Sequence, residues 1–123
     1  MALKLPSNMP KNILRQPQSD EAIELIAARF RALGEPNRLK LIMAVERGGK
    51  NVSQLVAATG LSQPNVSRHL QTLTCACILA RRKERMSVFY TIADRAICGL
   101  YKQVFDGLQK RLTTQANAFG RQA

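Results

Sequence analysis

Residues 59–73, with the sequence TGLSQPNVSRHLQTL, determine the fold that the rest of the chain supports. Gly60 suits the left-handed backbone conformation that closes a helix. Ser62 can cap the free amide groups of the next helix, and Pro64 is tolerated in a first turn. The stretch therefore predicts two helices joined by a tight turn, a helix-turn-helix.

The second of these helices has an apolar side and a polar side. Val66, Leu70 and Leu73 recur every three to four residues and form one apolar stripe. The outward side carries no acid that would repel a phosphate; its polar side chains are Asn65, Ser67, Arg68, Gln71 and Thr72. Such side chains can bond to base edges and phosphates, so the pattern favours a DNA-recognition helix over a merely solvated face.

Composition points to nucleic acid as the partner. The chain has 123 residues, enough for one domain, and its 19 Lys and Arg against 8 Asp and Glu give a net charge of +11. Such charge attracts polyanions. No apolar run is long enough to span a bilayer, and the start lacks the apolar region of a signal peptide, so we expect a cytoplasmic protein with no membrane partner. The three cysteines are then free thiols in a reducing compartment.

The predicted elements form one domain between two flexible ends. Residues 1–18 are a proline-rich basic arm, residues 19–115 the folded domain and residues 116–123 a tail. Ser19 caps a first helix that ends at Gly34. A second runs from Pro36 to the glycines at 48–49, and Ser53 caps a short third one that ends at residue 60.

After Leu73 the hydrophobic period changes from helical to alternating, which predicts an antiparallel hairpin over residues 78–92. Four cations lie near its tip, namely Arg81, Arg82, Lys83 and Arg85, which makes it a basic wing beside the recognition helix. Asp94 caps a long last helix. The predicted fold is mainly α with a small β hairpin (α+β), a winged helix-turn-helix in the order α-α-α-α-β-β-α.

Two predicted helices carry apolar stripes that need a partner. The first helix has Ile23, Ile26 and Phe30 on one side. The last helix has a longer stripe, made of Ile97, Tyr101, Val104 and Leu108. A dimer interface would bury both stripes.

The sequence resembles the ArsR/SmtB family of dimeric winged-helix repressors over residues 22–112. The resemblance rests on the order of the predicted elements and on the segments ALGEPNRLKLI, LSQPNVSRHL and VFYTIAD. The resemblance implies a homodimer, joined by the first and last helices, that binds an inverted-repeat operator in double-stranded DNA and is released by an inducer. It carries over the DNA-contacting positions of the recognition helix and wing as Ser62, Gln63, Asn65, Ser67, Arg68, His69, Arg82 and Arg85, beside the outward Gln71. His69 borders the apolar stripe, so a phosphate contact and a packing role are both open.

The family's metal sites do not carry over. Residues 51–55, NVSQL, have no thiol where many members have Cys-x-Cys. Of the four zinc ligands on the last helix only Asp94 remains, and the other three positions are Ala96, Gly107 and Lys110. Cys77 and Arg85 replace glycines of related proteins, so either the turns differ or some strain is tolerated.

The three cysteines suggest a sensing site. If the hairpin turns at about residues 84–85, position 77 lies opposite about Ile92. Cys75, Cys77 and Cys98 then converge, and could bind arsenite or a thiophilic metal such as cadmium, or oxidise in pairs. The alternative is that each cysteine is a small packing residue.

The leading prediction is thus a sequence-specific transcriptional repressor. The alternative within the same class is a nucleoid-type protein that coats DNA without sequence preference, for which the charge alone would suffice. An enzyme is not expected, because the chain has one His and no nucleophile with a paired base.

Overall fold

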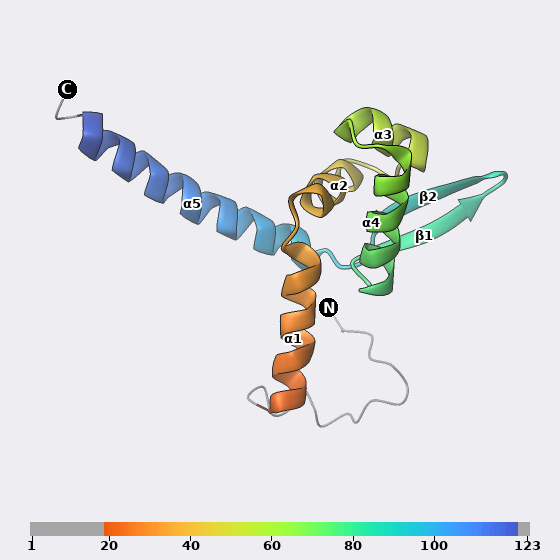
Figure 1. Cartoon of the computed structure of the whole chain (residues 1–123), viewed down its shortest axis with the longest axis horizontal. Helices are drawn as coiled ribbons and strands as arrows, with labels where there is room; N and C mark the ends of the chain where they lie inside the picture. Colours follow the sequence, from red (N-terminus) through yellow and green to blue (C-terminus); the bar gives the residue numbers. More distant parts are fainter. Residues whose placement is uncertain (1–18, 121–123) are drawn as a thin grey trace.

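The structure, a computed structural model, describes residues 19–120, and side chains as far as residue 118. The predicted arm at 1–18 and residues 121–123 lie outside this range. The elements follow the predicted order (Figure 1): α1 (Asp20–Leu33), α2 (Pro36–Glu46), α3 (Val52–Thr59), α4 (Gln63–Cys75), β1 (Leu79–Glu84), β2 (Ser87–Ile92) and α5 (Ala96–Gly120). The predicted fold class is confirmed.

Side-chain caps begin the helices, and one differs from the prediction. Ser19 and Ser62 cap α1 and α4 as expected, since each hydroxyl accepts a hydrogen bond from a first-turn amide. The cap of α3 is Asn51, not Ser53: Asn51 accepts from the amide of Gln54 at 2.9 Å, and the Gln54 side chain accepts from the amide of Asn51 at 2.9 Å. This reciprocal pair satisfies two amides at once, and a cap at Ser53 would satisfy fewer.

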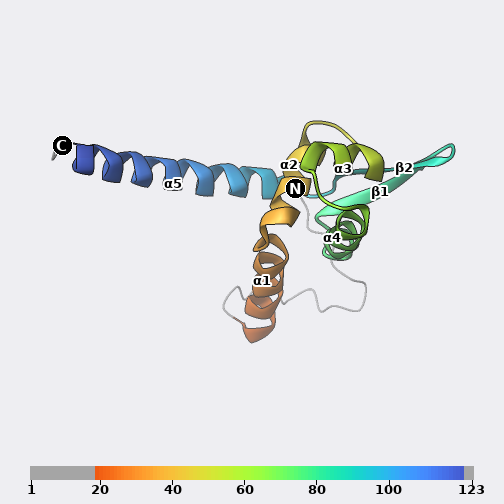
Figure 2. The ribbon, with the colours of Figure 1, turned by 45° about the horizontal axis from the view of Figure 1, so that its top comes forward.

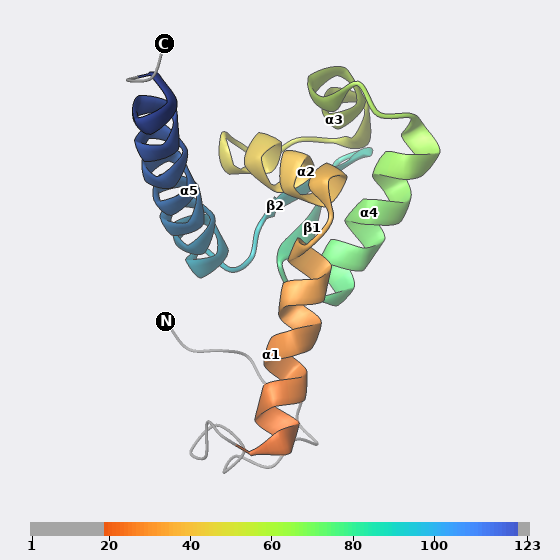
Figure 3. The same ribbon diagram turned by 60° about the vertical axis from the view of Figure 1, so that its left-hand side comes forward.

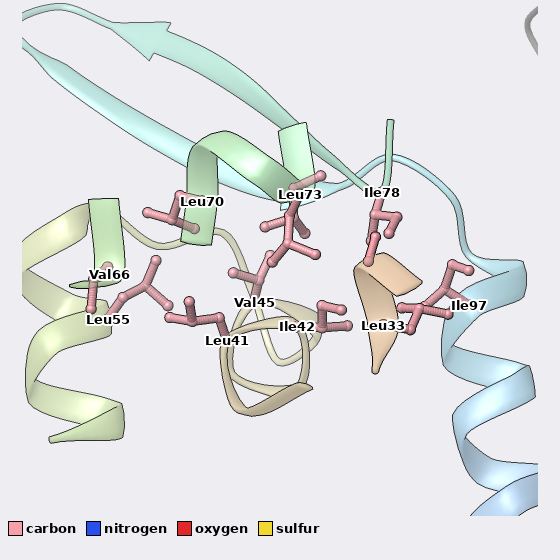
Figure 4. Packing of buried hydrophobic residues seen from close by; sticks show 12 residues of the cluster. Leu33, Leu41, Ile42, Val45, Leu55, Val66, Leu70, Leu73, Ile78 and Ile97 are labelled. Carbon is pink, nitrogen blue, oxygen red and sulfur yellow. The ribbon is translucent and has the colours of Figure 1, made fainter. Parts of the chain in front are cut away.

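The hydrophobic core lies where α2, α3 and α4 meet the base of the hairpin (Figure 4). Leu41, Ile42 and Val45 of α2 face Leu55 of α3 and the predicted apolar stripe of α4. The last turn of α1 and the first turn of α5 close the remaining side through Leu33 and Ile97. The core therefore fixes α4 from its inner side and leaves its outer side free.

The two outer helices leave this body in different directions (Figures 1 and 3). The residues of α5 from 102 to 118 are all exposed, and most of α1 is exposed as well. The tail predicted from residue 116 is wrong for residues 116–120, which continue α5. The sequence from 113 to 118 has no glycine or proline that would end a helix there.

The hairpin is anchored at its base and free at its tip. Lys50 forms a bridge to Tyr90 of β2, with amide-to-oxygen distances of 2.8 and 3.2 Å, which ties the wing to the segment before α3. In the hairpin, Leu79 pairs with Ile92 and Glu84 with Ser87. The turn therefore lies at residues 85–86, one position later than predicted, and the whole pairing moves by two residues.

Cys77 and Arg85, at the glycine positions of related proteins, have φ of 60° and 55°. Cys77 follows the end of α4, where the amide of Ile78 donates to the carbonyl oxygen of Leu73 and the amide of Cys77 to that of Thr74, both at 3.0 Å. These are the bonds of a Schellman motif, which requires a left-handed residue at this position. The turns are thus kept, and a cost of about 1 kcal/mol for each non-glycine residue is tolerated.

Candidate nucleic-acid interface

The outer side of α4 is a polar surface that the core does not use. Core contacts bury Val66, Leu70 and Leu73, while the predicted DNA-facing side chains are open to solvent, with Asn65 partly exposed: Ser62, Gln63, Asn65, Ser67, Arg68 and Gln71. Gly60, with φ of 74°, makes the tight turn that sets α4 across α3. The recognition face is therefore held by packing on the opposite side of the same helix.

Arg68 is held in place on this surface. One of its guanidinium nitrogens donates to Oδ1 of Asn65 at 3.0 Å, one turn earlier on α4. The bond restrains a long flexible side chain before any DNA binds, while its remaining donors stay available. A guanidinium with two free parallel donors matches the O6 and N7 acceptors of guanine or two phosphate oxygens.

His69 does not belong to the DNA-facing set, which corrects that prediction. Its side chain is turned inward and the residue is only 8% exposed. Its Nε2 lies 3.7 Å from Oε2 of Glu35, the residue whose carboxylate also caps α2 through the amide of Arg38. Of the two roles left open by the sequence, the structure supports packing between α4 and α2.

The wing extends from the body close to α4 (Figures 1 and 2) and is exposed from residue 81 to residue 87. The cations of the wing are solvated. Nε of Arg82 lies 3.2 Å from Oε1 of Glu84, and this carboxylate weakens the attraction of Arg82 for a phosphate. The tip also carries Met86, which is 96% exposed. Met86 was not predicted to be part of this surface, because the alternating period places it in the strand and not in the turn.

The predicted dimerisation residues fall into two groups. Ile23, Ile26 and Phe30 of α1 are exposed, as are Val104 and Leu108 of α5, together with Phe105 and Leu112. Ile97 was assigned to this surface wrongly: it is 6% exposed and packs in the chain's own core. It lies in the first turn of α5, which still contacts the body. Tyr101, at the boundary, is half-buried and stacks on Phe105 with ring centroids 6.4 Å apart.

Comparisons with known proteins agree on one family. The family described as "Bacterial regulatory protein, arsR family" matches residues 35–76. A "Transcriptional repressor SmtB homolog" of Synechocystis is 35% identical over 91 residues, which cover 74% of this chain and 68% of that protein. The chain belongs to the arsR family of bacterial regulatory proteins. It is a winged helix-turn-helix transcriptional regulator, and the exposed side of α4 with the wing is its candidate DNA-binding surface.

Two further relatives of this arsR-family regulator are informative. A "Probable mercury resistance operon repressor" of Streptomyces lividans is 35% identical over 71 residues, covering 58% of this chain and 57% of that protein. The solution structure of a homodimeric winged helix-turn-helix DNA-binding domain from Mycobacterium bovis, described as a possible ArsR-family regulator, superposes with a TM-score of 0.69 at 26% identity, over 77% of this chain and 91% of that one. In residues 19–120 of the present chain, no helix is long and apolar enough to cross a membrane.

The predicted meeting of three thiols is not found in this arsR-family chain. Among the described residues, no three His, Cys, Asp or Glu side chains form a group that could hold a metal ion. Cys75 and Cys77 are exposed at the end of α4, and Cys98 is half-buried in α5. The shifted hairpin register explains the error: it pairs Ile92 with Leu79, so Cys77 stays in the turn before the strand.

Cys98 and Asp94 are already engaged by neighbouring groups. Burial, followed by the nearby Glu46 carboxylate, raises the pKa of the Cys98 thiol above its ordinary value of 9.0, so the thiol is protonated at neutral pH. Asp94, the remaining family ligand position, accepts from the amide of Ala96 at 3.1 Å and from the Arg29 guanidinium at 2.5 Å. Neither group is arranged to bind a metal within one chain.

Proposed function

We propose that this chain is a homodimeric repressor that binds an inverted-repeat DNA operator and is released by an inducer. The observation that carries the proposal is the pairing of two surfaces on one chain. One is the solvent-exposed polar side of α4 with its basic wing, and the other is the apolar side of α1 and α5, which is exposed in the described part of the chain.

A second copy of the chain is the natural cover for the apolar side. Eight large hydrophobic side chains on α1 and α5 are exposed, namely Ile23, Leu25, Ile26, Phe30, Val104, Phe105, Leu108 and Leu112. Soluble monomers rarely expose that many on two helices. A twofold interface uses the same patch on both copies, and it sets two α4 helices in opposite directions. A site with inverted symmetry, whose halves are about one helical turn apart, fits such a dimer.

The proposed DNA-binding surface can both position the protein on the duplex and read its base sequence. Wing cations and amides near the capped start of α4 suit phosphate contacts, which carry no sequence information. The side chains of Asn65, Arg68 and Gln71 suit base edges in the major groove. If the dimer neutralises about six phosphates, the logarithm of the binding constant falls with the logarithm of salt concentration at a slope near −5.

For the inducer, we propose a thiophilic agent that reacts with the exposed Cys75 and Cys77. Two observations support this choice: both thiols are open to solvent, and they flank the end of the recognition helix. One relative is named as a probable mercury resistance repressor. Arsenite or cadmium bound by these two thiols would alter the end of α4, and an effector of this kind acts by binding the DNA-free state more tightly.

The experiment is selection of duplexes from a random pool by the purified protein, followed by footprinting and competition with random duplex. A specific repressor selects an inverted repeat and prefers it by about 10³ or more. A preference near unity would instead identify a nucleoid-type coating protein.

Release by arsenite, cadmium or peroxide is then compared in the wild type, Cys75→Ser and Cys98→Ser. Release that is abolished only in Cys75→Ser supports the exposed thiols, and equal release in all three proteins rejects them.

A further inference from the structure

Arg29 lies where three helices meet, and the proposed DNA contacts do not use it. Its guanidinium donates to the carbonyl oxygen of Ala76, directly after α4, and to Oδ2 of Asp94, two residues before α5. The side chain is largely buried, with 26% of its surface exposed, and Asp94 has 16% exposed. Figures 1 and 3 both show α1 beside the end of α4 at which this contact forms.

Both partners need a cation at this place. The carbonyl groups of the last turn of a helix have no partner within the helix, and a positive charge is favourable there because of the helix dipole. The Asp94 carboxylate would otherwise be a poorly solvated anion beside α5. A planar guanidinium can donate in two directions at once, whereas a lysine ammonium lacks this fixed fork.

Backbone hydrogen bonds already join the end of α4 to the segment before α5. The Schellman bond from Ile78 to Leu73 fixes the end of α4, and the amide of Ala93 donates to the carbonyl oxygen of Ile78 at 3.0 Å. These bonds join α4 to the segment that leads into α5. Among the described residues, the Arg29 side chain hydrogen-bonds to both from α1, and α1 enters the core one turn later, through Ala32 and Leu33.

We propose that Arg29 is a positioning residue that sets the recognition helix relative to the two helices of the dimer interface. The inference rests on the proposed function. In a twofold dimer, the separation of the two α4 helices must match that of two half-sites, about 34 Å along the duplex. Loosening α4 relative to α1 and α5 weakens binding to the matched site, but not the charge-driven binding to any duplex.

The test compares Arg29→Gln with Arg31→Gln. Arg31 is exposed on the same helix, so the two variants lose the same charge and only one loses the contact. Each protein is titrated with a duplex selected by the wild type and with random duplex, over a range of salt. Sedimentation gives the dimer fraction, and denaturant unfolding gives the folded fraction. We expect the preference of Arg29→Gln for the selected duplex to fall by about tenfold, the scale of a typical coupling between sites. Its salt slope and its affinity for random duplex should equal those of Arg31→Gln.

A second pair of variants keeps the inference falsifiable if Arg29→Gln is poorly folded. Asp94→Asn keeps an oxygen that can accept from the Ala96 amide and replaces the oxygen facing Arg29 with an amide nitrogen, so the contact to Arg29 loses both its charge and its acceptor. It should lose part of the same preference, because it removes one of the two contacts of Arg29. Where Arg29→Gln folds, the double variant should be no worse than Arg29→Gln, because Asp94 acts through Arg29. Additive losses overturn the inference, as does a preference equal to that of Arg31→Gln or a loss explained by dissociated dimer. A wild type without any preference overturns the proposed function first, and this inference with it.

Discussion

The region from α2 to α4 buries its apolar side chains within one chain, whereas α1 and α5 leave many of theirs exposed. In the first region the helix starts are capped, the turn at Gly60 is left-handed and the apolar stripes are buried against one another. In the second, both helices carry large apolar side chains into solvent, and α5 continues far beyond the body (Figure 2). Within the described residues, the same sequence thus contains a region that buries its apolar side chains and two helices whose apolar sides are exposed.

This difference separates recognition from assembly. A substitution inside the core of α2 to α4 should act on folding, one on the apolar side of α5 should act on association, and one on the outer side of α4 should act on DNA alone.

The largest effect is expected in the core. Leu70 of α4 is fully buried, so Leu70→Ala removes apolar contacts and leaves a cavity. We expect the free energy of unfolding to fall by about 3 to 4 kcal/mol, measured by denaturant titration. Gln71→Ala, the exposed neighbour, serves as the control and should leave stability nearly unchanged. Equal losses in both variants would show that α4 is not held by its inner side.

The next effect concerns association. Val104 is exposed on the apolar side of α5, so Val104→Glu places an unpaired charge in the proposed interface once from each copy. We expect the dimer to weaken by about 2 to 4 kcal/mol, seen as monomers in sedimentation, with helix content retained. Gln103→Glu adds the same charge one residue away and should dimerise normally. A Val104→Glu protein that remains an unaltered dimer would place the interface elsewhere.

Arg68→Ala tests the outer side of α4. The loss of one good base contact is expected to cost about 1 to 3 kcal/mol in binding to the selected duplex, while folding and dimerisation stay normal. The control is Arg47→Ala, which removes an exposed charge at the end of α2. If a band-shift titration gives equal affinities for the two variants, Arg68 contributes charge and not readout.

The smallest effect is a gain. Cys77 has φ of 60° at the left-handed position that ends α4, where glycine is favoured. Cys77→Gly should raise the free energy of unfolding by up to about 1 kcal/mol. Cys75→Gly, within the last turn of α4, should instead lower it by roughly 0.3 kcal/mol, since glycine has the lower helix propensity. A loss of stability in both would mean that the Cys77 side chain makes a contact worth more than the strain.

Much of the site was predictable because it depends on local chemistry. The helix-turn-helix follows from Gly60, Ser62 and the stripe of α4, and the wing follows from a change of period. Helix caps were less predictable: Asn51 and Ser53 are both good caps, and only the side chain of Gln54, bonding back to the amide of Asn51, favours the first. A shift of one residue in the hairpin turn likewise changed the predicted neighbour of Cys77.

The sequence by itself determined the order of elements, the polar side of α4, the basic wing and the family, because period, caps and charge are properties of neighbouring residues. Tertiary structure alone decided that His69 faces Glu35, that Ile97 belongs to the core and that the three thiols do not form one metal-binding group. It also placed Arg29 of α1 between Ala76 and Asp94, 47 and 65 residues away along the chain. Contacts over such separations depend on how helices are oriented in space, and no local pattern encodes that orientation.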